Sequence, residues 1–473
     1  MRSLSLIALS AIPLQASAEK VLGAYVFARH GDRTAKILKN TELTVLGYNQ
    51  VYQTGTAYHD RYINSTSSHY IDGIEEQVVD LDQLTASAPA DAVLQNSATG
   101  FLQGVYPPVG AMSSMELAND TTVESPLNGY QLIPLSLIDS GASSEDSTWL
   151  QGTTDCNKAK TSSDSYYESA LYKKLLDETK DFYKSLAPLI NTSFSDADMT
   201  FRNAYSIYDY LNVGSIHNKT NTPTESQLHQ AFLYANIEQY NLAYNDSETV
   251  RAIAGSTLAA EMLMGLNETV TSQGKVKLHV EFGSYGTFLS YFGLAHLPAA
   301  DVNFTGIPDY ASSMVWELVT NSTSDSFPST DEISVRFGFH NGTMTSSFSS
   351  PTEFPLYDQS SATIPWSTFV EQTEKIAVMT TEQWCDVCGN TNGQCASSGG
   401  SSDSGNASTN STDGGNGGGI SKAVAGVIGA MVTLAVVLGL QALFLLMGPF
   451  RLSKKGRAAD ASPEGTVVEE NKD

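Results

Sequence analysis

The sequence predicts an α/β fold, in which a central sheet lies between helices and is interrupted by a mainly helical insertion. The first observation is an apolar run from Val21 to Ala28 that ends abruptly in charged residues around a glycine, as a buried strand does. The second is the order of the patterns that follow. Strand and helix patterns alternate early, residues from about 140 to 270 are rich in helix formers, and strand character then returns.

The individual elements follow from the spacing of apolar residues and from the proline and glycine at their ends. Besides the first strand, strand character is found in residues 130–138, 276–282, 314–319 and 333–339. Helical spacing is found in residues 43–62, 91–104, 171–186, 201–211, 226–244, 250–266 and 366–377. The long helical stretch in the middle is the predicted insertion, and it divides the strands into an early and a late group.

Both ends of the chain predict processing and membrane anchoring. Residues 1–18 have the pattern of a cleaved signal peptide, with an apolar stretch before Ala16-Ser17-Ala18. Residues 396–419 are rich in Ser, Gly and Asn and predict a flexible, glycosylated linker. Residues 420–450 predict a transmembrane helix, and the basic residues that open 451–473 place this tail in the cytoplasm.

These segments predict a type I single-pass membrane protein whose ectodomain, residues 19–395, lies outside the cell. The surface location is supported by sequons for N-glycosylation, which stop at the linker. We therefore expect the plasma membrane, with the vacuolar membrane as the alternative. The acceptor residues are Asn64, Asn119, Asn191, Asn218, Asn245, Asn267, Asn303, Asn321, Asn341, Asn406 and Asn410.

The four cysteines, Cys156, Cys385, Cys388 and Cys395, predict two disulfides in an oxidising compartment. Three pairings are possible, and the sequence does not choose among them. A zinc site built on Cys385 and Cys388 is the alternative, but no fourth ligand lies at the usual spacing. A formal net charge of −25 argues against nucleic acid as a partner, and at neutral pH it would repel polyanionic substrates.

The segment Arg29-His30-Gly31-Asp32-Arg33 carries the most specific chemistry in the chain. It follows the first strand, and ligands in open α/β sheets bind at the carboxyl ends of strands. Two guanidinium groups can bind the oxygens of a phosphate, a neutral imidazole can attack phosphorus, and glycine allows a ligand to come close. The alternative is a basic strand end paired with surface carboxylates. We favour a phosphate pocket.

This segment resembles the signature of the histidine acid phosphatases, the branch of the histidine phosphatase superfamily that includes fungal phytases. The resemblance extends over residues 21–395, and it implies a phosphoglycerate mutase-like fold with a mixed central sheet and, by analogy, a fungal source. Further matching segments are Leu43-Thr-x-x-Gly47-x-x-Gln50, Ser97-Ala98-x-x-Phe101-Leu-x-Gly104-x-Tyr106-Pro-Pro108, Pro308-Asp-Tyr-Ala-Ser312 and Val335-Arg-Phe337.

The resemblance implies a two-step hydrolysis of phosphomonoesters. His30 would attack phosphorus and carry the phosphoryl group as a phosphohistidine, while Arg29 and Arg33 bind the equatorial oxygens. In the family a distal aspartate protonates the leaving alcohol, and a neighbouring histidine and a third arginine complete the pocket. Asp32 is not at the position of that acid. The implied partner is a small phosphorylated substrate, and no metal or organic cofactor is implied.

Several positions depart from the family pattern. The third arginine is replaced by Val93, and the final proline of the signature by Ala35. The distal His-Asp pair is absent: aligning strand ends puts Ser284-Tyr285 there, whereas counting back from Phe292-Gly-Leu294 puts Glu281-Phe282 there. His279 and Glu281 would share one face of a strand. We take Glu281 as the candidate substitute acid and Tyr285 as its alternative.

Two functions of different classes fit these residues. The first is a membrane-anchored extracellular acid phosphatase that forms a phosphohistidine and has weak or altered activity. The second is a pseudophosphatase, a surface glycoprotein that binds a phosphorylated ligand without turning it over. The complete nucleophile segment favours the enzyme, whereas Val93 and the missing acid favour the second function. The sequence indicates neither the natural substrate nor an oligomeric state.

Overall fold

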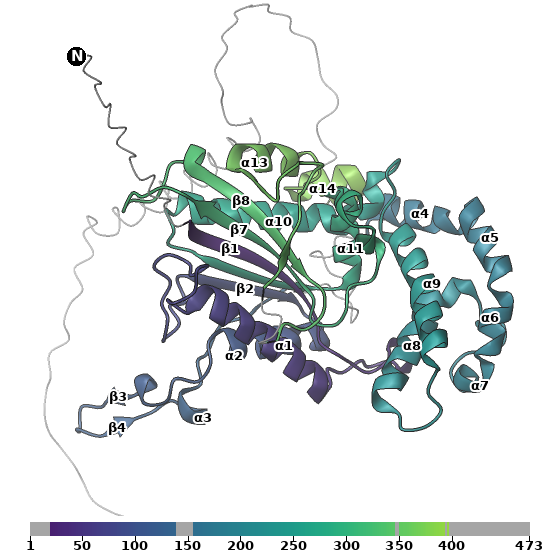
Figure 1. Cartoon of the computed structure of the whole chain (residues 1–473), viewed down its shortest axis with the longest axis horizontal. Coiled ribbons are helices and arrows are strands. Elements are labelled where there is room, and N and C mark those ends of the chain that lie inside the picture. Colours follow the sequence, from purple (N-terminus) through teal and green to yellow (C-terminus); the bar gives the residue numbers. More distant parts are fainter. Residues whose placement is uncertain (1–18, 139–154, 346–349, 393–394, 397–473) are drawn as a thin grey trace, which may run out of the picture. The chain divides into compact units, whose positions relative to one another are not determined.

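The computed structural model of the chain describes residues 19–138, 155–345, 350–392 and 395–396, and β1, Lys20–Arg29, lies at the centre of its sheet. Within these residues eight strands form the sheet in the order β10-β8-β7-β1-β6-β2-β5, and β9 pairs with β8. β1 runs parallel to β6 and antiparallel to β7. The predicted α/β fold with a mixed central sheet and flanking helices is therefore confirmed (Figure 1).

The sheet strands other than β1 are β2 Leu84–Pro89, β5 Ser136–Ile138, β6 Leu278–Gly283, β7 Ser313–Thr320, β8 Ile333–His340, β9 Thr352–Glu353 and β10 Thr363–Pro365. A separate hairpin pairs β3 Met115–Glu116 with β4 Thr122–Val123. The helices are α1 Val45–Tyr58, α2 Ala92–Val105, α3 Pro126–Gly129, α4 Asn157–Ser165, α5 Ala170–Glu178, α6 Lys180–Ser185, α7 Ala187–Ile190, α8 Ala204–His217, α9 Glu225–Ala243, α10 Ile253–Thr271, α11 Tyr285–Leu294, α12 Leu297–Ala300, α13 Trp366–Glu374 and α14 Thr381–Cys388.

Both faces of the sheet are covered, because side chains of β1 alternate between two apolar cores. Val26 and Ala28 belong to the core shared with α1 and α2. Tyr25 and Phe27 belong to the core shared with α10 and α11. In Figure 1, α1 and α2 lie below the sheet, and α10 and α13 lie above it. A strand buried on both faces explains why β1 is a continuous apolar run.

The helices α4 to α9 lie to one side of the sheet in Figure 1. Helices α5 to α9 share a core of their own, rich in tyrosine and phenylalanine, which includes Tyr183, Phe201 and Leu211. Helix α10 differs from them, because Leu258 and Met262 pack in the core above the sheet with β1. Sequence patterning alone groups α10 with the insertion, since its helical spacing does not reveal the partner of its apolar face.

Two disulfides join Cys156 to Cys388 and Cys385 to Cys395. The prediction of two disulfides is thereby confirmed and the pairing is decided. The Cys156–Cys388 bond connects the start of α4 with the end of α14, two segments separated by 232 residues. Sequence spacing does not indicate such a pairing, because only the folded chain brings these segments together.

The predicted signal peptide 1–18, linker 396–419, transmembrane helix 420–450 and tail 451–473 lie, apart from residue 396, outside the described residues. In the part of the chain that the structure describes, no helix is both long and apolar enough to cross a membrane. Asn406 and Asn410 also lie outside it. The other predicted glycosylation acceptors are all exposed or partly exposed, so each is sterically open to modification.

Two parts of the strand prediction differ from the structure. The strand expected at 130–138 is formed only at Ser136–Ile138. Strand β2, Leu84–Pro89, is absent from the prediction because its residues are Leu, Thr, Ala, Ser and Pro, several of which are depleted in strands. β2 is held in the sheet by its parallel pairing with β6 on one side and with β5 on the other.

Candidate active site

The segment Arg29 to Arg33 leaves β1 at its carboxyl end and is buried. Arg29, the last residue of β1, lies opposite Gly283, the last residue of the parallel strand β6. The side chains of His30, Asp32 and Arg33 are fully buried. Two neighbouring parallel strands thus end at the same edge of the sheet, which is where α/β proteins place their ligand sites.

Two glycines allow this segment to lie directly on the first turn of α1. A Cβ added to Gly31 would lie 2.2 Å from the carbonyl oxygen of Gly47, and one added to Gly47 would lie 2.0 Å from that of Asp32. No side chain tolerates such contacts. The backbone N–H of Gly31 also donates to Ser97 Oγ of α2 at 3.3 Å. The segment is therefore held by α1 and α2.

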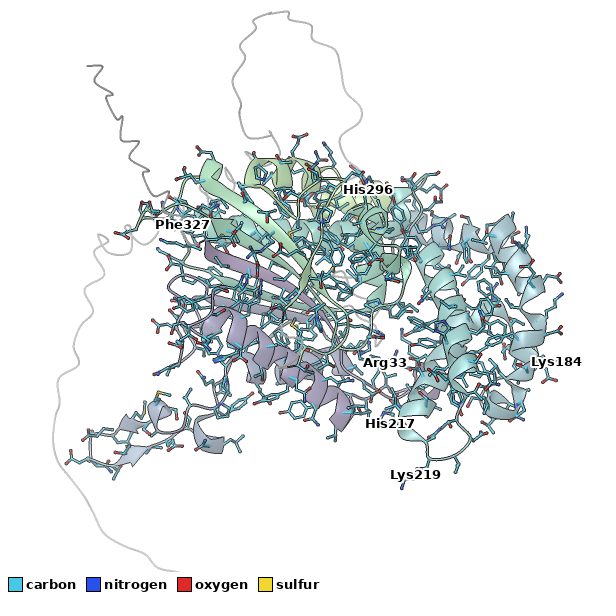
Figure 2. All side chains as sticks on the ribbon, in the orientation of Figure 1. Arg33, Lys184, His217, Lys219, His296 and Phe327 are labelled. Carbon is cyan, nitrogen blue, oxygen red and sulfur yellow. A yellow bond between two sulfur atoms is a disulfide. The ribbon has the colours of Figure 1, made fainter. Side chains whose placement is uncertain are left out.

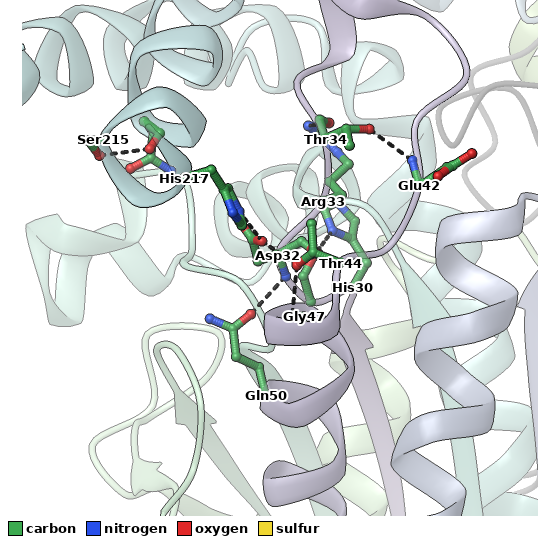
Figure 3. A network of polar contacts seen from close by, with 12 residues as sticks. His30, Asp32, Arg33, Thr34, Glu42, Thr44, Gly47, Gln50, Ser215 and His217 are labelled. Atoms are coloured by element: carbon green, nitrogen blue, oxygen red, sulfur yellow. Dashed lines mark hydrogen bonds and ion pairs between the residues drawn. The ribbon is translucent and has the colours of Figure 1, made fainter. Parts of the chain in front are cut away.

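The remaining residues of the 43–50 motif position Asp32 (Figure 3). Thr44 is the N-cap of α1, where its Oγ1 accepts from the N–H of Gly47 at 3.0 Å, and this hydroxyl contacts the Asp32 carboxylate. Gln50 Oε1 accepts from the N–H of Asp32 at 2.7 Å. Thr44, Gly47 and Gln50 of the motif at 43–50 thus support the segment that contains His30.

His30 has the tautomer that a nucleophile needs. Its Nδ1 lies 2.8 Å from the carbonyl oxygen of Gly31, and because a carbonyl oxygen only accepts, Nδ1 carries the proton. In the neutral ring the lone pair then belongs to Nε2. The imidazole packs against Tyr310, with 5.6 Å between the ring centroids.

Arg29 is held between aromatic rings. Its guanidinium carbon lies 4.8 Å from the ring centroid of Tyr310 and 5.4 Å from that of Tyr285. One terminal nitrogen donates to the carbonyl oxygen of Pro308, and Nε has no hydrogen-bond partner among the described residues. The rings fix the plane of the guanidinium and leave part of its donor capacity for an anion.

Arg33 is paired with a carboxylate from the helical insertion. Its Nη1 lies 3.0 Å from Asp209 Oδ1 of α8, and its Nη2 donates to the hydroxyl of Tyr205 at 3.1 Å. Asp209 is buried and also accepts from the backbone N–H of Lys36 at 2.8 Å. Sequence reasoning missed Asp209, because 176 residues separate it from Arg33 and it belongs to no recognised motif.

His217 is a second residue that the insertion brings to this site. It ends α8, and its Nε2 lies 2.7 Å from Asp32 Oδ2. Figure 2 shows Arg33 and His217 close together where the sheet meets these helices. The His217 side chain is 37% exposed, so this contact joins the buried segment to the protein surface. The insertion therefore contacts the segment through three residues of α8, Tyr205, Asp209 and His217.

The two positions expected from the alignments for the family's distal His-Asp pair lie at different places relative to the end of β6. Strand β6 ends at Gly283, so Ser284 and Tyr285 stand at its carboxyl end and open α11. The Tyr285 ring lies against Arg29, and its hydroxyl donates to Gln239 Oε1 at 2.9 Å. Tyr285 is therefore the residue that the strand ends bring to Arg29.

Glu281 and His279 lie further back on β6, as side chains of one strand face. Glu281 pairs in register with Phe27, and its carboxyl accepts from the hydroxyl of Tyr25. Burial raises the pKa of Glu281 well above its usual value. His279 lies between the hydroxyls of Thr85 and Thr269, at 2.8 and 3.2 Å. The side chains of Glu281 and His279 thus contact other residues of the sheet and of α10.

The position of the family's third arginine is part of the core. Val93 lies in the first turn of α2, is fully buried and brings no charge. Asp91 caps this helix by accepting from the N–H groups of Val93 and Leu94 at 2.9 and 3.1 Å. The hollow beside Arg29, which Tyr208, Asp209 and neighbouring residues line, has a volume of about 20 Å³. One or two water molecules fill such a space.

Comparison with known proteins now adds to this geometry. The family described as histidine phosphatase superfamily (branch 2) matches residues 36–340. The chain belongs to this family. The match begins after Arg33, so it is independent of the segment that carries His30. Membership supports a phosphatase-type function in general.

The fold is shared with bacterial phytases. The apo phytase of Hafnia alvei has a TM-score of 0.52 at 11% identity, with 80% of this chain and 99% of that chain covered. The Citrobacter braakii phytase has a TM-score of 0.52 at 12% identity, with 78% and 99% covered. The Klebsiella sp. ASR1 phytase has a TM-score of 0.51 at 11% identity, with 76% and 96% covered. No curated protein matches the chain.

Proposed function

We propose that this chain is a phosphomonoesterase that forms a phosphohistidine at His30. The observation that carries the proposal is the buried His30, whose Nδ1 donates to the carbonyl oxygen of Gly31 and leaves Nε2 as the nucleophilic atom, in a segment that also carries Arg29 and Arg33 at the carboxyl end of β1. A buried imidazole of this tautomer is a nucleophile, and the two flanking guanidiniums bind the oxygens of a phosphoryl group. Membership of the histidine phosphatase superfamily supports the same chemistry.

The reaction has two displacements at phosphorus. In the first, Nε2 of His30 forms the N–P bond while the P–O bond to the substrate alcohol breaks, and the alcohol leaves with a proton from an acid or from water. In the second, water attacks phosphorus, the N–P bond breaks, and inorganic phosphate leaves with His30 again neutral. The arginines stabilise the charge on the equatorial oxygens in both transition states. Arg33 has to exchange its contact with Asp209 for the phosphoryl group.

Tyr285 is the residue that we propose as proton donor to the leaving alcohol. It stands at the end of β6 beside Arg29, whereas the Glu281 carboxyl contacts Tyr25 on an interior position of the strand. A phenol is a much weaker acid than a carboxylic acid. Turnover of alkyl phosphates should therefore be slow, while aryl phosphates, whose leaving groups need little protonation, should react faster.

The cellular setting belongs to the same proposal. A cleaved signal peptide at 1–18 and a transmembrane helix at 420–450 would anchor the enzyme at the cell surface, with the ectodomain 19–395 outside the cell. Two disulfides and the exposed or partly exposed sequons support a secreted ectodomain. The substrate is then a small extracellular phosphomonoester, and the hydrolysis needs no cofactor.

A second candidate function is favoured by the Arg33–Asp209 ion pair. A pseudophosphatase that binds a phosphorylated ligand without turnover fits this contact. It also fits the 20 Å³ hollow and the replacement of the third arginine by Val93. The two functions differ in a single measurable property, the release of phosphate.

The test is an assay of the purified full chain at pH 3 to 7 with p-nitrophenyl phosphate and glycerol phosphate. We expect hydrolysis of the aryl ester, slower hydrolysis of the alkyl ester, and loss of both in His30→Ala. His229→Ala is the matched control, because His229 is an exposed histidine on α9. Phosphate binding without any release would reject the enzyme and establish the pseudophosphatase.

A further inference from the structure

We propose that the pocket beside α9 binds the hydrocarbon chain of the substrate, which makes the substrate class a single-chain alkyl phosphate monoester. The inference rests on the proposed function of His30. The pocket has a volume of about 1000 Å³ and lies between α9, the 3-10 turn Val302–Thr305 and the strands β8 and β9. This volume is at the upper end of the range for small-molecule sites, and a single aromatic ring would leave most of it empty.

The walls of the pocket are mostly apolar, with asparagine, glutamine and threonine side chains among them. On α9, Leu233, Ile237 and Tyr240 line the pocket, and their spacing of four and three places them on one helical face. The opposite wall carries phenylalanines, among them Phe292 and Phe304. The part of α9 that is buried within the protein, Ala231, Ala235 and Glu238, lies at other positions. The pocket face of α9 is thus an apolar surface that protein covers only in part.

The charge of the lining excludes a polyphosphorylated ligand. Asp301 is the one charged residue among the lining residues that the structure describes. A second phosphate group in this pocket would lose its hydration and gain no cation in return, which is costly. An alkyl chain gains free energy from the same surface. The ligand is therefore charged at one end only.

The charged end of such a ligand would reach Arg29. Ile307 and Pro308 line both the pocket and the hollow beside Arg29, and the carbonyl oxygen of Pro308 accepts from that arginine. Tyr208, which lines the hollow, packs on Phe232 of the pocket with 5.1 Å between ring centroids. The pocket and the Arg29 guanidinium are thus neighbours on either side of Ile307 and Pro308, and a ligand with an apolar chain and a phosphate head would span these two residues.

The experiment measures binding and turnover separately along a chain-length series. The full chain is held in lipid nanodiscs without free detergent and titrated with ethyl, hexyl and decyl phosphonate, which cannot be hydrolysed. Hydrolysis of the matching alkyl phosphates is measured in parallel. Each methylene that enters the pocket should tighten binding about fourfold, so decyl phosphonate should bind at least about a hundredfold more tightly than ethyl phosphonate.

Leu233→Glu is the test variant and Leu171→Glu the matched control. Both leucines are exposed helix residues, 41% and 44% respectively, but only Leu233 lines the pocket. The chain-length gain is the ratio of the affinity for decyl phosphonate to the affinity for ethyl phosphonate. We expect Leu233→Glu to reduce this gain at least tenfold and Leu171→Glu to leave it unchanged. Equal losses in the two variants, or an affinity that does not depend on chain length, would overturn the inference.

Two further outcomes are informative. Asn303 and Asn341 both border the pocket and are predicted glycosylation sites, so the series is repeated with the double variant Asn303→Gln, Asn341→Gln. A chain-length gain that appears only in this variant would overturn the inference, because a glycan would then occupy the pocket. A gain in phosphonate binding without hydrolysis of any ester would support the pocket assignment and reject the enzyme, so the two proposals fail independently.

Discussion

Replacing Asp209 by asparagine should move the stability of the protein and its affinity for phosphate in opposite directions. Asp209 holds Arg33 at 3.0 Å in a fully buried ion pair, and Arg33 is one of the two guanidiniums that we assign to phosphate. Asparagine has nearly the same shape but only one acceptor oxygen, whereas Arg33 and the backbone N–H of Lys36 donate to different oxygens of Asp209. With its oxygen toward Arg33, asparagine keeps that hydrogen bond, so the substitution removes the negative charge and the hydrogen bond from Lys36.

The loss of stability follows from the charge that is left behind. Removing one partner of a buried ion pair costs about 3–5 kcal/mol, because the remaining charge stays out of water without compensation. Since asparagine keeps a hydrogen bond to Arg33, we expect the free energy of unfolding to fall by about 3 kcal/mol in phosphate-free buffer.

The gain in affinity follows from the competition that is removed. Phosphate has to displace the Asp209 carboxylate from Arg33, and a hydrogen bond to a charged group contributes about 1.5–3 kcal/mol. At 1.4 kcal/mol for each factor of ten, inorganic phosphate should bind the variant about ten- to a hundredfold more tightly. Phosphate at a hundred times its Kd would then return about 2.7 kcal/mol of the lost stability.

The assay is calorimetric titration with inorganic phosphate, together with thermal unfolding at zero and saturating phosphate. Asp164→Asn is the matched control, because Asp164 pairs with Lys160 on the exposed face of α4 and should change neither quantity by more than about 0.5 kcal/mol. Weaker phosphate binding by Asp209→Asn would refute the reasoning. It would mean that Asp209 orients Arg33 for the ligand instead of competing with it.

Three further predictions follow from other parts of the structure. Burial lowers the pKa of His279 to about 4 from 6.5, so the unfolded chain binds more protons between these pH values. Stability should therefore rise by about 3 kcal/mol from pH 4 to pH 6.5 in urea denaturation, and His279→Gln should flatten this rise. Tyr285→Phe should slow glycerol phosphate hydrolysis about tenfold or more while Glu281→Gln leaves it nearly unchanged, and the reverse order would make Glu281 the acid. Reducing Cys156–Cys388, or Cys156→Ser, should cost about 2–5 kcal/mol in thermal unfolding, and an unchanged Tm would contradict a structural role.

The local sequence was sufficient to predict much of the fold and the part of the site that lies in the segment from Arg29 to Arg33. Strand β1 was readable because it is buried on both faces and so is a continuous apolar run from Val21 to Ala28. The segment from Arg29 to Arg33 was readable because its residue types are expensive to bury without a function. Strand β2 was not readable, because its Ala and Ser residues have no strand preference and only the neighbouring strands hold it in place.

The residues of α8 that contact this segment were revealed by the tertiary structure alone. Asp209 and His217 reach Arg33 and Asp32 from α8, across 176 and 185 residues, and neither belongs to a motif with its partner. The choice of Tyr285 over Glu281 likewise depended on where β6 ends beside Arg29. Hydrophobic periodicity reports which face of an element is buried, but it does not report which distant element covers that face. Ion pairs between such elements depend on the packing of the whole chain, and so only the folded structure revealed that the acidic side chain of Asp209 holds Arg33.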